Sequence, residues 1–167
     1  FTGIQITDVG IGILCDYVAA VRDEIGYEVP LAVDHFGHIG LKSCIRLGKA
    51  LDKFTLAWYE DMIPWQFADQ WAELTRAVDT PTCTGEDIYL KEGFLPLFQK
   101  NAVNIIHPDL ASSGGIMETK KIGDMCQEHG VAIGRSRHPN LSPAPGRVEG
   151  VADEVQEHLA EVRRIEA

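Results

Sequence analysis

Short apolar runs recur along the chain, and stretches with helical periodicity separate them. Brief runs of this kind are typical of strands buried on both faces of a parallel sheet. The five predicted strands are 31–33, 56–59, 81–84, 103–106 and 131–133. Apolar residues spaced as on one face of a helix predict five helices, within 14–25, 41–51, 71–78, 95–98 and 116–126. The last of these helices is predicted to open at Gly114-Gly115 and to close at His129-Gly130.

Alternating strands and helices predict an α/β protein with a parallel sheet, either an open doubly wound sheet or a closed barrel. Acidic residues decide between these two architectures. Asp34, Glu60, Glu86 and Asp109 follow four successive predicted strands at nearly equal intervals. Acids at the ends of successive strands converge on one point only if the strands encircle that point. The sequence therefore predicts an incomplete (β/α)₈ barrel of the TIM type with about five β/α units.

Three carboxylates that meet at one point repel one another unless a cation lies between them. Oxygen ligands without Cys or His favour Mg²⁺, ahead of Mn²⁺ or Ca²⁺. We therefore predict that Asp34, Glu60 and Glu86 bind Mg²⁺. Any one of these acids alone would be better explained as a helix cap or as the partner of a lysine.

Composition narrows the classes of partner. The chain has 167 residues and a formal net charge of −10, which argues against nucleic acid as a partner. No apolar run approaches the roughly 20 residues that a membrane-spanning helix needs. The four cysteines are scattered and form no C-x-x-C pair, so we expect reduced thiols and a cytoplasmic protein.

Several ordered motifs resemble one known family. They are VD at 33–34, WYEDMIP at 58–64, TGED at 84–87, HPDL at 107–110 and GGI at 114–116. Together they resemble the mandelate racemase and muconate lactonizing enzyme branch of the enolase superfamily, from about residue 5 to about residue 133.

The resemblance implies a chemistry and a set of roles. In that family an Asp and two Glu ligate Mg²⁺, which corresponds here to Asp34, Glu60 and Glu86. The metal stabilises the enediolate that forms when a base removes the proton next to the carboxylate of a sugar acid or hydroxy acid. The residue that matches Asp109 orients a histidine at the end of the next strand. His35 and His107 are further candidates, because His35 follows the first ligand and His107 shares strand parity with Asp109.

The sequence also departs from the family. No lysine precedes Lys42, although the family carries a basic lysine motif on an earlier strand, and the residues after 136 do not match. We therefore expect a partial barrel domain at 1–136, a tail with a short amphipathic helix at 137–167, and self-association into a homo-oligomer. A fragment of a sugar-acid dehydratase is the leading prediction. A hydroxy-acid racemase or epimerase, and an inert fragment that only associates with other chains, are the alternatives.

Overall fold

The computed structural model describes residues 4–34 and 39–134. These residues fall into two compact units, of which the smaller comprises residues 7–30 and the larger comprises residues 4–6, 31–34 and 39–134. The smaller unit contains helix α1 (Asp8–Ile25). Thr7 is its N-cap residue: the side-chain oxygen of Thr7 accepts a hydrogen bond from the Gly10 amide at 3.1 Å.

The larger unit is a parallel sheet with four α-helices. Its elements in chain order are β1 (Val33–Asp34), α2 (Leu41–Leu51), the short 3₁₀-helix η1 (Asp52–Phe54), β2 (Tyr59–Glu60), α3 (Ala68–Ala77), β3 (Thr82–Thr84), α4 (Leu90–Gln99), β4 (Ile105–Ile106), α5 (Ile116–His129) and β5 (Ala132–Ile133). All five predicted strands and all five predicted helices are thus present. Helix α5 is bounded by Gly115 and Gly130, as predicted, and Gly130 adopts the left-handed conformation that ends many helices.

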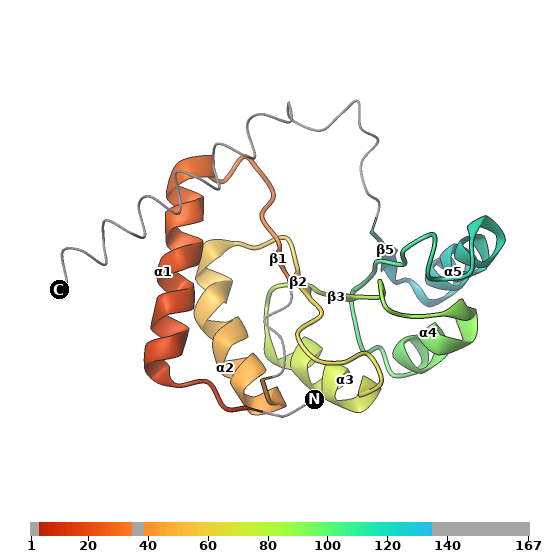
Figure 1. The fold of residues 1–167 in the computed structure, drawn as a ribbon, viewed down its shortest axis with the longest axis horizontal. Helices are drawn as coiled ribbons and strands as arrows, with labels where there is room; N and C mark the ends of the chain where they lie inside the picture. The colour runs from red at the N-terminus through yellow and green to blue at the C-terminus, as the bar shows by residue number, and fades with distance from the viewer. Residues whose placement is uncertain (1–3, 35–38, 135–167) are drawn as a thin grey trace. The chain divides into compact units, whose positions relative to one another are not determined.

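The order of the strands identifies the architecture. The sheet runs β1-β2-β3-β4-β5, so each strand pairs in parallel with the next strand of the chain. Since crossovers between parallel strands are right-handed, an order that never reverses places successive helices on one face. Helices α2 to α5 follow one another along that face, each packed on the next (Figure 1). A doubly wound sheet would reverse its order at a switch point, and the barrel-type prediction is confirmed.

Successive side chains along a strand point to opposite faces of the sheet, one towards the helices and one away from them. Tyr59 is fully buried, and its hydroxyl donates to the carbonyl of Gly48 in α2 at 2.8 Å. The next residue, Glu60, points to the opposite face of the sheet, as successive strand residues must. The large side chains of the core include Trp71 of α3 and Phe94 and Phe98 of α4. The helical face of the sheet therefore holds the strands in place, and the other face is available for polar groups.

Candidate metal site at the strand ends

The parallel register places one polar side chain beside the next. Asp34 of β1 pairs with Glu60 of β2, and Glu60 pairs with Cys83 of β3. Paired residues of parallel strands lie on the same face, so these three side chains form one row across the sheet. Glu86, the third predicted ligand, lies two residues beyond the end of β3 and is exposed.

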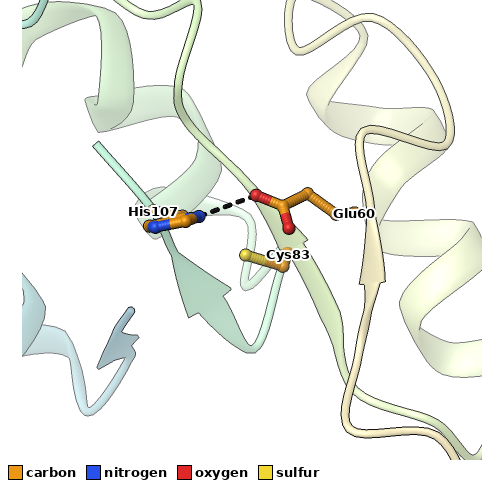
Figure 2. A group of neighbouring side chains, drawn as sticks. All are labelled: Glu60, Cys83 and His107. Atoms are coloured by element: carbon orange, nitrogen blue, oxygen red, sulfur yellow. Dashed lines mark hydrogen bonds and ion pairs between the residues drawn. The ribbon is translucent and has the colours of Figure 1, made fainter. Parts of the chain in front are cut away.

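Glu60 lies at the centre of the site and is only 8% exposed. The indole Nε1 of Trp58 donates to Glu60 Oε2 at 2.7 Å, and His107 Nδ1 lies 2.7 Å from Glu60 Oε1. Figure 2 shows the imidazole of His107, which follows β4, and the carboxylate of Glu60 on β2 directed at one another across β3. A carboxylate taken out of water needs such donors on both oxygens, because a buried charge without them is costly.

Two glycines make room for His107. A Cβ on Gly85 would lie 3.1 Å from the backbone of His107, and Gly85 has a φ of +147°, which side chains rarely adopt. A Cβ on Gly134 would lie 3.0 Å from Cδ2 of the His107 ring. The ring therefore occupies space that neighbouring strand ends leave open, and this allows it to reach Glu60.

The pKa of Asp61 responds to the negative charges gathered at the strand ends. Its amide donates to the carbonyl of Cys83 at 3.1 Å, and its carboxylate accepts from the Thr84 hydroxyl at 2.5 Å. Burial raises the pKa of Asp61 to about 6, and the negative charges of Glu60, Glu86 and Asp34 add to this rise although the Thr84 hydroxyl opposes it. All three predicted metal ligands thus contribute to one region of negative potential, which favours a cation.

Cys83 is a residue whose place in the site the sequence did not indicate. The thiol is 1% exposed, and burial, together with the charges of Glu60, Asp61 and Asp34, raises its pKa. We expected reduced thiols; Cys83 is buried and forms no disulfide within the described residues. The sequence shows which residues of the strand share a face with Cys83. It does not show that Cys83 lies next to Glu60, because that depends on the register between β2 and β3.

The carboxylate of Asp109 accepts hydrogen bonds from backbone amides of its own loop. Its Oδ2 accepts hydrogen bonds from the amides of Ala111 at 3.1 Å and Ser112 at 2.7 Å. These bonds, the one from Ser112 first, lower the pKa of the exposed Asp109 carboxyl. Ser112 also donates to the backbone carbonyl of Glu86 at 2.7 Å, so the loop of Asp109 is tied to the loop of a predicted ligand. The histidine that Asp109 was predicted to orient would lie beyond Gly134, outside the described residues, as does His35.

One group of side chains in residues 4–34 and 39–134 brings metal-binding atoms close together. The ligand atoms of Glu60, Cys83 and His107 all lie within 4.8 Å of one another (Figure 2). Asp34 and Glu86 are not members of this group, so their role as ligands alongside Glu60 stays a prediction. The parallel α/β sheet, whose strands pair in chain order, and the acidic side chains at its strand ends define a (β/α)-barrel type of chain with a candidate cation site.

Comparison with known proteins identifies the family. Residues 2–142 match the family described as Enolase C-terminal domain-like, and the chain belongs to this family within the enolase superfamily. A D-gluconate/D-galactonate dehydratase of Picrophilus torridus is 32% identical over 126 residues, which cover 75% of this chain and 32% of that protein. A D-xylonate dehydratase of Haloferax volcanii is 34% identical over 119 residues, which cover 71% of this chain and 29% of that protein.

Solved structures agree with this assignment. A mandelate racemase/muconate lactonizing enzyme-like protein from Rubrobacter xylanophilus superposes with a TM-score of 0.75 at 34% identity, over 80% of this chain and 34% of that chain. The 3,6-anhydro-D-galactonate cycloisomerase of Zobellia galactanivorans gives a TM-score of 0.71 at 33% identity, over 76% of this chain and 36% of that chain. The chain therefore spans about a third of the length of the relatives it matches. In the part of the chain that the structure describes, no helix is long and apolar enough to cross a membrane.

Proposed function

We propose that this chain supplies the metal-binding strands of a Mg²⁺-dependent sugar-acid dehydratase. The observation that carries this proposal is the likeness to proteins named as dehydratases of gluconate, galactonate, xylonate and galactarate. The racemase and inert-fragment alternatives have no comparable support. The proposed substrate is a small sugar acid with a hydroxyl on each of the two carbons next to its carboxylate.

We assign the cation to Asp34, Glu60 and Glu86, whose oxygen donors suit Mg²⁺. When bound, Mg²⁺ would stabilise the negative charge that develops on the substrate carboxylate as the neighbouring carbon loses its proton. Trp58 would keep Glu60 oriented through its 2.7 Å hydrogen bond. A ligand held in this way loses little freedom when the cation arrives.

His107 and the loop of Asp109 complete the proposed machinery. Because a carboxylate can only accept, His107 carries its proton on Nδ1 towards Glu60, and in the neutral ring Nε2 is then an acceptor. Nε2 points away from Glu60 (Figure 2), and we assign it a contact with a substrate hydroxyl. His35 and Asp109 stay proposed acid–base residues by family likeness.

The test is a screen of sugar acids against the gene product that carries this chain, with Mg²⁺ and with chelator. Loss of the α-proton and the β-hydroxyl as water leaves an enol that becomes a 2-keto-3-deoxy acid, which a carbonyl reagent detects. Glu60→Gln should abolish this product, and Asp69→Asn should not, because Asp69 is an exposed acid on α3 paired with Lys100. Exchange of the α-proton for deuterium without a new carbonyl would instead indicate a racemase or epimerase.

A further inference from the structure

Three neighbouring strands each contribute one potential metal ligand of a different kind. Glu60 belongs to β2, Cys83 to β3, and His107 directly follows β4. Their oxygen, sulfur and nitrogen atoms lie within 4.8 Å of one another and face a common space (Figure 2). This donor set is unlike the all-carboxylate set proposed for Mg²⁺, and the proposed function makes no use of its sulfur.

The chemistry of these donors selects another class of cation. Thiolate and imidazole favour Zn²⁺ and related borderline metals, whereas Mg²⁺ prefers oxygen and rarely binds sulfur. Zinc binds its ligands at about 2.0–2.3 Å in a tetrahedral arrangement, so ligand atoms in a formed site lie roughly 3.3–3.8 Å apart. A spread of at most 4.8 Å therefore needs only small movements of side chains to close on a metal.

The surroundings permit those movements. His107 Nδ1 and Glu60 Oε1 share a proton across 2.7 Å, and a cation could take the place of that proton once the two atoms move apart to about 3.3 Å. The absent side chain of Gly134 leaves one side of the imidazole unobstructed. A divalent cation would displace this proton and the thiol proton of Cys83, as metals do when thiols coordinate them.

We propose that Glu60, Cys83 and His107 form a binding site for a thiophilic divalent cation of the zinc type, with water as the fourth ligand. Because Glu60 also belongs to the proposed Mg²⁺ site, the two cations exclude each other. Zn²⁺ would thus act as an inhibitor that competes with the activating metal. Only this competition rests on the proposed function; the site itself does not.

Cobalt is the probe for this site, since Co²⁺ substitutes for zinc and is coloured. Titration of the full chain with Co²⁺ should produce a near-ultraviolet band from thiolate-to-metal charge transfer. Cys83→Ser should remove that band, and Cys126→Ser should retain it, because Cys126 is a buried free thiol on α5 away from the site. His107→Gln should weaken Co²⁺ binding by at least about 10–100-fold, the loss typical when only a group supporting a metal ligand is removed.

A band that survives Cys83→Ser, or Co²⁺ binding without any thiolate band, overturns the proposal. Circular dichroism confirms that each variant is folded. Should Cys83→Ser not fold, the ¹¹³Cd chemical shift of the cadmium-loaded wild-type chain decides, since only a sulfur ligand moves it far downfield. Displacement of Co²⁺ by excess Mg²⁺ supports the shared ligand, and indifference to Mg²⁺ contradicts it. A Co²⁺ thiolate band in a protein that dehydrates no sugar acid refutes the proposed function alone, and dehydration without the band refutes this inference alone.

Discussion

Asp52 connects three parts of the larger unit, and its removal should destabilise the strand that carries Glu60. Its Oδ1 accepts a hydrogen bond from the Thr80 amide at 3.0 Å, and its Oδ2 accepts one from the Asp79 amide at 3.1 Å. Oδ1 also lies 3.0 Å from the Tyr59 hydroxyl, whose single proton it shares with the Gly48 carbonyl. The carboxylate thus links η1 to β2 and to the loop before β3. Tyr59 lies directly before Glu60 in β2, so this anchor also fixes the position of the candidate site.

The substitution Asp52→Asn keeps the shape and removes one acceptor. The new amide nitrogen meets one of the two backbone N–H groups, so at least one of the present bonds is lost. A hydrogen bond to a charged group contributes about 1.5–3 kcal/mol. Because Asp52 is only half-buried, water recovers part of this, and we expect a loss of about 1–2 kcal/mol in the free energy of unfolding.

The effect should depend on pH in a defined direction. Burial raises the pKa of the Asp52 carboxyl, but the bonds from Asp79, Thr80 and Tyr59 outweigh this and lower it below its usual range. The unfolded chain has the ordinary aspartate pKa of about 3.9. The stabilisation is therefore complete above pH of about 4 and is lost as the pH falls through the lower pKa of the folded state.

The difference in free energy of unfolding between wild type and Asp52→Asn can be measured by urea unfolding. The measurement is made at pH 7 and at the lowest pH at which both proteins still fold. The gap between the two proteins should narrow in acid. Asp69→Asn is the matched control, because Asp69 is 85% exposed in its side chain and its ion pair with Lys100 should contribute less than about 1 kcal/mol. Equal stability of wild type and Asp52→Asn at pH 7, or a gap that does not change with pH, would refute the reasoning.

Three further predictions follow from other contacts. Trp58→Phe leaves one oxygen of the buried Glu60 without its donor, and thermal or urea unfolding should show a loss of about 1–3 kcal/mol. Gly134→Ala places a Cβ 3.0 Å from the His107 ring and should lower the free energy of unfolding by about 1–3 kcal/mol. Gly123→Ala in α5 meets only an ordinary contact at 3.7 Å and should raise it by about 0.5–1 kcal/mol. A change of the same sign in both variants would contradict these expectations. Light scattering should find the purified chain self-associated, because β5 pairs only with β4 among the described strands and leaves an edge that can pair with another chain; a monodisperse monomer would show otherwise.

Local patterns in the sequence were sufficient for the fold. Apolar runs located all five strands that the described residues form, because a strand buried on both faces must be apolar along its length. The boundaries differ by up to six residues: α1 begins at Asp8, ahead of the predicted residue 14, and Val78, predicted to belong to the third helix, lies just after its end. Ladder bonds nevertheless extend over the predicted residues, since the Ala57 amide donates to the carbonyl of Leu31 at 2.8 Å.

The candidate site was only partly predictable. The sequence indicated Glu60 and the strand ends, but the neighbours of Glu60 depend on the register between strands, which a linear pattern does not contain. Cys83 was therefore not among the predicted metal ligands. The contact of Trp58 could have been anticipated, because residues two apart on a strand share a face. Aspartate side chains in turns commonly accept hydrogen bonds from backbone amides two or three residues further on, as Asp109 does. These bonds could have been predicted, but the resemblance to the family directed attention to a catalytic role for Asp109 instead.

The row of paired residues that begins with Asp34, Glu60 and Cys83 continues through Ile105 and Ala132. Backbone hydrogen bonds fix the positions in this row, and they do not depend on which side chain each position carries. An exchange at Ile105 or Ala132 would bring a new functional group next to the existing ones while the ladder stays intact. One or two substitutions in this row could therefore change the chemistry of the candidate site, with no loop to rebuild and no helix to repack.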